Sequence, residues 1–215
     1  MAFPMPLYEL DLQRGGARTE RERMLAGDLY HPSDPELTER RTRARRLLNL
    51  YNSTDQADQD ARNALLGLLL GSQVDRAWIE PPFFCDYGDN LSLASNVFIN
   101  ANCVILDCAR VSIGRNTLIG PAVQIYTGHH PIDGRTRATG AELAAPVIIG
   151  DDVWIGGGAI ICPGVTIGEG SVIGAGSVVT HNIPANVVAV GNPCRVLRAI
   201  RHNERREAHH ANGAL

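Results

Sequence analysis

The most constraining feature of this sequence is an aliphatic residue that returns at every sixth position in its second half. A period of six fits neither an amphipathic helix, which repeats at about 3.6 residues, nor hairpin strands, which alternate at about two. It is typical of the hexapeptide repeat of a parallel β-helix. The repeat runs through Ile149, Ile155, Ile161, Ile167, Ile173 and Val179, followed in turn by Gly150, Gly156, Cys162, Gly168, Gly174 and Thr180.

The same spacing also occurs earlier in the chain, and it resumes there after a slip of two residues. If each unit is a short strand plus a corner, its aliphatic side chain stacks on those of the coils above and below. We expect the neighbouring glycine to provide the backbone angles of a tight corner. The predicted fold is mainly β, with a β-helix over residues 76–193. The earlier repeats are Leu93, Ile99 and Ile105, then Ile113, Ile119 and Ile125.

Helical signals fill residues 1–75, and we expect a C-terminal helix or tail over 194–215. Each predicted helix start carries a residue that can cap the first turn. The first two starts have further support, one from a capping box and one from a proline at the first helical position. The three starts are Thr19 with Glu22, Asp34 with Pro35, and Thr54, the last leading to Gly71.

Composition excludes several classes of protein. With 44% hydrophobic residues, the chain is not disordered overall. Its net charge of −3 argues against a surface that binds nucleic acid over most of the protein. The sequence has no apolar run long enough to span a bilayer, and its start lacks the pattern of a secretion signal, so we expect no membrane partner and a cytoplasmic protein. Five cysteines without a CxxC pair indicate reduced, mostly buried thiols.

The period of six stops between Ile125 and Ile149, where the chain contains YTGHHPIDGRTRATG at residues 126–140. A solenoid accepts insertions as loops that leave its wall and re-enter in phase, and such loops commonly carry function. We therefore predict an inserted loop at about 127–146.

Two stretches of the chain carry a family resemblance: DDVWIGGGAIICPGVTIGEGSVIGAGSVVT and IPANVVAVGNPCRVLR. They resemble the hexapeptide-repeat acyltransferases, above all the maltose and galactoside O-acetyltransferase group, which includes the nodulation-factor acetylases. The similarity extends from AGDLYHPSDPEL to Arg198. It implies a left-handed β-helix, a homotrimer with active sites between subunits, acetyl-CoA as co-substrate, and no metal.

The resemblance also assigns catalytic roles in the inserted loop. The family's catalytic histidine lies in a His-Pro sequence, which matches His130, with His129 as the alternative register. A neutral imidazole can take the proton of a hydroxyl as the oxygen attacks a thioester. Glu142 matches a carboxylate proposed to orient that histidine, and Asp133 is a weaker candidate; either is alternatively a solvated loop acid. We interpret Cys162 as structural.

Binding residues follow from the same resemblance. For the acceptor it implicates Asn100, whereas Asn96 and Asn102 fit a purely structural role at corners. The family's acidic acceptor-binding residue is missing here, and its neighbourhood holds His31, Pro32 and Asp34, of which Asp34 also looks like a helix cap. For the donor it implicates Trp154, Gly157 and Ala175 along the coenzyme A channel, and Thr180, His181, Arg195 and Arg198 at the adenosine phosphates.

The sequence thus predicts an acetyl-CoA-dependent O-acetyltransferase acting on a sugar hydroxyl, with His130 as general base in a ternary complex. Two alternatives stay open: an acceptor that is serine or an antibiotic hydroxyl, and a non-catalytic β-helix scaffold. A zinc-dependent carbonic anhydrase of similar fold is a poor match, because the repeats contain only His181. The sequence does not specify which sugar or which hydroxyl is acetylated.

Overall fold

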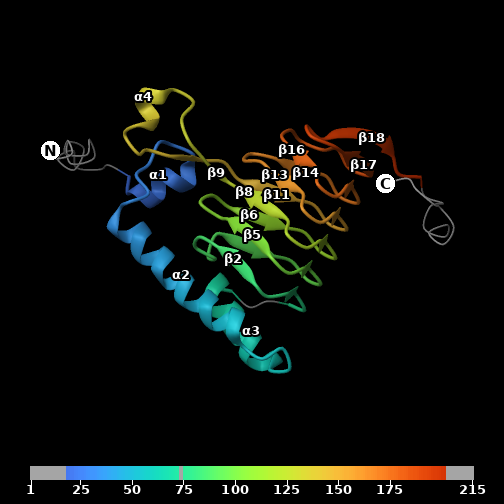
Figure 1. The fold of residues 1–215 in the computed structure, drawn as a ribbon, viewed down its shortest axis with the longest axis horizontal. Helices are drawn as coiled ribbons and strands as arrows, with labels where there is room; N and C mark the ends of the chain where they lie inside the picture. Colours follow the sequence, from blue (N-terminus) through green and yellow to red (C-terminus); the bar gives the residue numbers. More distant parts are fainter. Residues whose placement is uncertain (1–17, 73–74, 202–215) are drawn as a thin grey trace.

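A computed structural model describes residues 18–72 and 75–201 (Figure 1). Its main body is a stack of coils whose short strands form three sheets, in which all pairs are parallel except that of the last strand, β18. A seven-stranded sheet contains β1 (Trp78–Ile79), β4 (Phe98–Ile99), β7 (Leu118–Ile119), β12 (Trp154–Ile155), β15 (Val172–Ile173), β17 (Val187–Val190) and the antiparallel β18 (Arg195–Ala199). A five-stranded sheet contains β2 (Phe83–Cys85), β5 (Cys103–Leu106), β8 (Gln124–Tyr126), β13 (Ile160–Ile161) and β16 (Val178–Val179). A four-stranded sheet contains β3 (Leu91–Leu93), β6 (Val111–Ile113), β11 (Val147–Ile149) and β14 (Thr166–Ile167).

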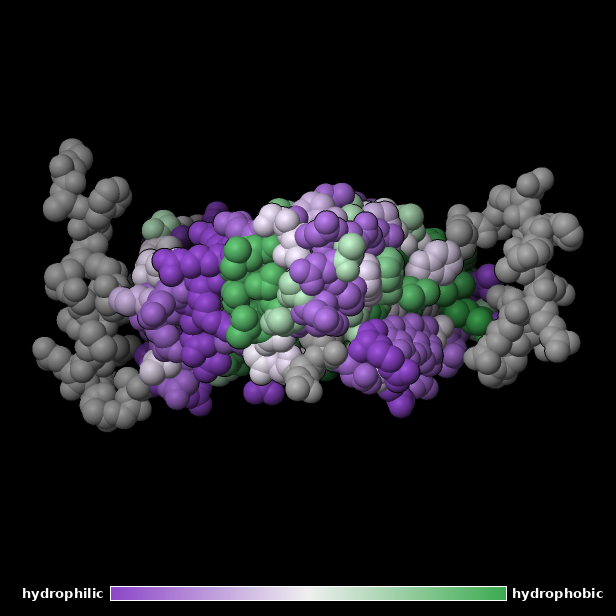
Figure 2. Space-filling model, turned by 90° about the horizontal axis from the view of Figure 1, so that it is seen from below, coloured by the Kyte–Doolittle hydropathy of each residue, from purple (hydrophilic) through white to green (hydrophobic). Residues whose placement is uncertain are grey.

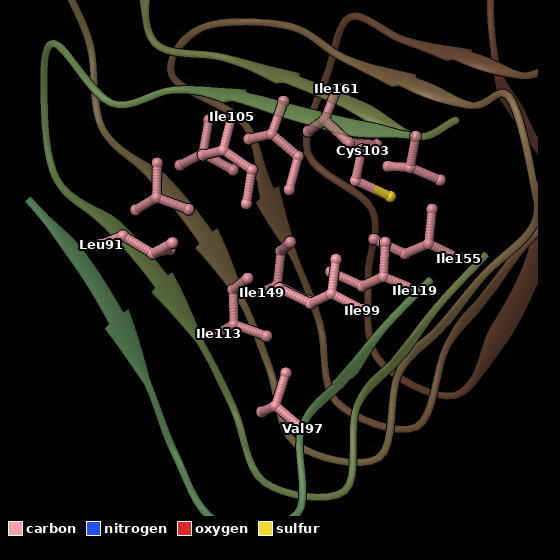
Figure 3. Packing of buried hydrophobic residues seen from close by; sticks show 14 of the residues in the cluster. Leu91, Val97, Ile99, Cys103, Ile105, Ile113, Ile119, Ile149, Ile155 and Ile161 are labelled. Atoms are coloured by element: carbon pink, nitrogen blue, oxygen red, sulfur yellow. The ribbon is translucent and has the colours of Figure 1, made fainter. Parts of the chain in front are cut away.

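The core is the stack that the period of six predicts. Ile155, Ile161, Ile167 and Ile173 are fully buried, and equivalent residues of successive coils are paired in register. Figure 3 shows buried side chains of this cluster, Ile155 and Ile161 among them, converging on the interior of the coil stack. The predicted parallel β-helix is confirmed.

The glycines beside the inward aliphatic residues have a different role from the expected one. Gly156 and Gly168 do not have positive φ; instead, a Cβ on Gly168 would lie 2.4 Å from the backbone nitrogen of Ala185 in the next coil. The left-handed conformation occurs two residues later, at Gly158 and Gly176. The equivalent corners elsewhere are occupied by residues including Asn96 and Asn102, which confirms the structural role expected for those two asparagines.

The two-residue slip corresponds to longer corners between the five-stranded and four-stranded sheets. The fully buried Asp107 lies in one of these corners, just after β5. Its carboxylate accepts backbone N–H groups of the coil below, from Asp86 at 3.0 Å, Tyr87 at 2.8 Å and Gly88 at 2.7 Å. The additional residues thus form a corner held by a buried carboxylate.

Three helices cover the N-terminal end of the stack, α1 (Glu20–Ala26), α2 (Pro35–Ser53) and α3 (Gln59–Leu70). The capping box at Thr19 and the cap at Asp34 are confirmed. The predicted start at Thr54 is wrong, because Thr54 ends α2 and its hydroxyl donates to the carbonyl of Leu50. Asp58 caps α3 by accepting the N–H of Ala61.

The helix expected after residue 194 is also wrong over its described part. Residues Arg195–Ala199 form β18, which pairs with β17 and is the edge strand of the sheet. The rest of that predicted segment, from residue 202 onward, lies outside the described residues. In the described part of the chain, no helix combines the length and apolar character needed to cross a bilayer.

Candidate active site

A groove of about 360 Å³ lies on the outer surface of the seven-stranded sheet. It brings together four residues that the sequence predicted separately, namely Asn100, Trp154, Gly157 and Ala175. The groove wall is formed by outward side chains of adjacent strands, since Phe98 pairs with Leu118, Leu118 with Trp154, and Trp154 with Val172.

The groove is mainly apolar, with small residues at its corners. Gly120, Gly156, Gly157, Gly174 and Ala175 leave room for a molecule to approach the wall closely. The Trp154 side chain is 44% exposed. Asn100 contributes a side-chain amide to the lining of the groove. Its oxygen accepts the backbone N–H of Ala101 at 2.8 Å, and this bond does not involve the amide nitrogen. Such a channel suits an extended, mostly apolar ligand arm with polar recognition at one end.

The same sheet continues from the groove to the predicted phosphate-binding residues. Beyond β15 lie β17 and β18, where Arg198 pairs with Val188 and Arg195 with Val190. Both arginines are exposed. Thr180 and His181 follow β16, and the hydroxyl oxygen of Thr180 lies 2.9 Å from the Nδ1 atom of His181. The cationic side chains therefore lie towards the C-terminal end of the coil stack.

The predicted catalytic loop leaves the wall after β8 and returns at β11. It contains a hairpin of β9 (Gly128–His129) and β10 (Leu143–Ala144), with the short α4 (Gly134–Arg137) between them. His130 is exposed and directly follows β9. Asp133 caps α4 through the N–H and hydroxyl of Thr136, both at 2.7 Å, and these bonds lower the pKa of its carboxyl.

Glu142 and His130 each lie one residue beyond the end of the pairing in this hairpin. Leu143 pairs with His129 and Ala144 with Gly128, so continuing this register by one residue would set Glu142 across from His130. Among the described residues the imidazole of His130 makes no hydrogen bond, and Oε2 of Glu142 accepts the hydroxyl of Tyr30 at 2.8 Å. The orienting role of Glu142 therefore stays a prediction.

Sequence reasoning missed Tyr30, which is 1% exposed and forms an isolated bridge with Glu142. His31 follows it, and the backbone N–H of His31 donates to Glu20 at 2.6 Å. Asp34 caps α2 by accepting the N–H groups of Glu36 and Leu37, so its structural reading is confirmed. The sequence signal for Tyr30 was only its position beside His31.

One chain does not bring His130 to the groove. The groove lies on the seven-stranded sheet, whereas the loop joins a strand of the five-stranded sheet to one of the four-stranded sheet. It therefore departs from the corner opposite the groove, and it packs against the N-terminal segment near α1. In Figure 1 the loop with α4 lies beside α1.

The five cysteines are the other side chains whose reactivity bears on function. The structure shows all five as free thiols, with Cys162 partly buried and the other four buried. Within residues 18–72 and 75–201 there is no group of three or more His, Cys, Asp or Glu side chains arranged to hold a metal ion.

The fold and the groove define the class, a solenoid of hexapeptide repeats closed by helices at one end. Residues 23–73 match the maltose acetyltransferase hexapeptide capping motif, and residues 146–181 match the bacterial transferase hexapeptide family model of six repeats. The chain belongs to the hexapeptide-repeat acyltransferases, in the maltose and galactoside O-acetyltransferase group. The predicted resemblance, with its left-handed parallel β-helix, is thus confirmed.

Three similar proteins illustrate the relationship. Nodulation protein L of Rhizobium meliloti is 51% identical over 83% of this chain and 98% of its own length. A crystal structure of a maltose O-acetyltransferase from Clostridium difficile 630 is 47% identical, with a TM-score of 0.84 over 86% of this chain and 100% of that chain. A galactoside acetyltransferase solved with coenzyme A is 39% identical, with a TM-score of 0.84 over 88% of this chain and 94% of that chain.

Proposed function

We propose that this protein is an acetyl-CoA-dependent O-acetyltransferase that acts on a sugar hydroxyl in the cytoplasm. The observation that carries the proposal is the groove, in which Asn100, Trp154, Gly157 and Ala175 meet on the sheet that ends in Arg195 and Arg198. The related galactoside acetyltransferase solved with coenzyme A supports the choice of donor.

The donor fits the groove from one end to the other. The apolar wall and the small corner residues accommodate a pantetheine arm along Trp154, Gly157 and Ala175. Arg195 and Arg198 supply planar donors for the adenosine phosphates, near Thr180 and His181. Members of the family usually carry lysine where this chain has His181, so an imidazole stands here in place of an ammonium group.

The acceptor hydroxyl is activated by His130. Neutral imidazole takes the hydroxyl proton as the oxygen attacks the thioester carbonyl; the new C–O bond forms, the C–S bond breaks, and the proton passes to the departing thiolate sulfur. Proton transfer of this kind contributes about 10²–10⁴-fold, and positioning of both substrates supplies much of the remainder. No acyl-enzyme is required, and Cys162 keeps a structural role.

The active site is completed by a second copy of the chain in a homotrimer. The loop that carries His130 leaves the coil stack at the corner opposite the groove, which supports a site that takes one of the two from a neighbouring chain. Exposed apolar side chains outside the groove, including Phe84 and Ile148, provide surface for such packing. Figure 2 shows hydrophobic surface between hydrophilic regions on the face seen from below.

The sugar is held by Asn100, whose amide can bond adjacent hydroxyls. Asp34 is engaged as a helix cap, so His31, the residue after Tyr30, is the better candidate for the second acceptor contact. The family's acidic acceptor-binding residue has no counterpart in this neighbourhood, which holds His31 and Pro32, and we expect this difference to affect which acceptor is chosen.

The test is release of free coenzyme A from acetyl-CoA against glucose, maltose, a galactoside, serine and chloramphenicol. We expect turnover on a sugar that falls at least ~10²-fold in His130→Ala. The matched control is His129→Ala, because His129 is its exposed neighbour on the same hairpin. Turnover on serine or chloramphenicol alone would instead assign the alternative acceptor, and no turnover with no acetyl-CoA binding would leave a scaffold.

A further inference from the structure

Three polar side chains stand in a row across the base of the catalytic loop. Glu142 forms an antiparallel bridge with Tyr30 on one side, and on its other side it lies next to Leu143, which pairs with His129, the neighbour of His130. Directly opposed residues of antiparallel segments place their side chains on the same face. Tyr30 and Glu142 therefore share one face, and His130, one residue beyond the end of the β9–β10 pairing, is the next polar residue of the row.

Three hydrogen bonds hold the first two members together. The hydroxyl of Tyr30 donates to Oε2 of Glu142 at 2.8 Å. The backbone N–H of Tyr30 donates to the carbonyl of Glu142 at 3.1 Å, and the N–H of Glu142 donates to the carbonyl of Tyr30 at 2.9 Å. Tyr30 is buried, Glu142 is half-buried and His130 is exposed, so the row leads from the interior to the surface.

The surroundings of Tyr30 keep its hydroxyl a donor. Besides Glu142, Cys108 faces it and Tyr87 shares its buried cluster. The thiol of Cys108 lies 3.5 Å from Oδ2 of Asp86, and Arg41 donates to the hydroxyl of Tyr87 at 2.6 Å. Burial raises the pKa of Tyr30 far above its ordinary value and that of Cys108 to about 12. Tyr30 thus stays protonated, and the Glu142 carboxyl is the acceptor.

We propose that Tyr30 is a positioning residue for the transfer reaction. Its hydroxyl fixes Oε2 of Glu142, which directs Oε1 to the ring N–H of His130 and holds the imidazole in one tautomer. The other ring nitrogen then faces the acceptor hydroxyl as the base. The inference rests on the proposed function in one respect, the role of His130 as general base. It adds that a residue of the N-terminal helical segment, 112 positions away from Glu142, sets the orientation of the base.

The direct test is the tautomer of neutral His130, measured by ¹⁵N NMR on protein labelled at histidine, with the signal assigned by its loss in His130→Gln. We expect one tautomer in the wild type, and a mixture like that of a free imidazole in Tyr30→Phe and Glu142→Gln. The control is Tyr87→Phe, which removes a phenol hydroxyl from the same buried cluster and should leave one tautomer. A mixture in the wild type, or a single tautomer retained in Tyr30→Phe, overturns the proposal.

Kinetics give a second readout. Tyr30→Phe keeps the ring and its packing, so we expect kcat to fall about 10-fold, with the KM for acetyl-CoA within about twofold of wild type. A merely structural role would lower the thermal unfolding midpoint and leave kcat of the folded protein unchanged. If wild-type protein released no coenzyme A with any acceptor, the proposed function would fail, and the tautomer comparison would still decide the role of Tyr30.

Discussion

Replacing Gly168 by alanine tests why glycine follows the inward aliphatic residue. A Cβ at Gly168 would lie 2.4 Å from N of Ala185 and 2.7 Å from its Cα, whereas ordinary contact begins at 3.4 Å. The two coils must therefore separate locally by about 1 Å, against a normal strand spacing of about 4.8 Å. The hydrogen bond from the Gly168 N–H to the carbonyl of Ile183, now 2.8 Å, would be lost.

The expected cost follows from these terms. Overpacking of a filled interior costs about 1–3 kcal/mol, and a lost backbone hydrogen bond costs about 1 kcal/mol. Alanine restricts the unfolded chain and offsets about 0.4–1 kcal/mol of this. We therefore expect Gly168→Ala to lower the free energy of unfolding by about 1–3.5 kcal/mol.

The matched control is Gly176→Asn. Gly176 has φ +68°, and a Cβ there would meet nothing within 4 Å. Asparagine occupies the equivalent corners at Asn96 and Asn102 with φ of 60° and 63°, so we expect a change within about 0.5 kcal/mol. The assay is urea unfolding followed by circular dichroism, at one protomer concentration for all variants because association would contribute to stability. If Gly168→Ala were as stable as Gly176→Asn, close coil contact would not be the reason for the glycine.

Two further predictions concern the buried corner and the shared site. Asp107→Asn leaves one acceptor oxygen where three backbone N–H groups converge, so we expect the free energy of unfolding in urea to fall by about 1–3 kcal/mol. The control is Asp86→Asn, at a half-buried neighbouring carboxylate, for which we expect little change. Equal losses in the two variants would contradict the role of Asp107 in holding the corner. His130→Ala and Asn100→Ala should each be inactive alone. When the two variants are refolded together in equal amounts, we expect about a quarter of wild-type coenzyme A release, because random assembly gives about a quarter of the sites between chains both intact residues. No recovery above the separate variants would show that both residues act within one chain.

The local features of this sequence determined much of the architecture. The period of six shows that the same kind of side chain returns once in every repeat. This was enough to predict the parallel stack and the inward position of Ile155 and Ile173. The caps at Thr19 and Asp34 were predictable because a cap bonds only to groups two or three residues away. The failure at Thr54 shows the limit of such signals, since Asp58 is an equally good local cap and tertiary packing decided between them.

Other features depended on partners far away in the chain. The segment Arg195–Ala199 forms a strand because the edge of β17 offers it backbone hydrogen bonds, which its own residues do not reveal. The glycine after each inward residue looked like a turn residue, and only the distance to the next coil gives its actual role.

For the candidate site, the sequence supplied the residues and the tertiary structure supplied their grouping. Resemblance named Asn100, Trp154 and Ala175 one by one, and the register of the seven-stranded sheet put them in one groove. No sequence pattern linked Tyr30 to Glu142, because their bond joins positions 112 residues apart. Short-range periodicity fixes which side chains face inward, whereas contacts between coils, cap and loop exist only after the whole chain has closed around its core.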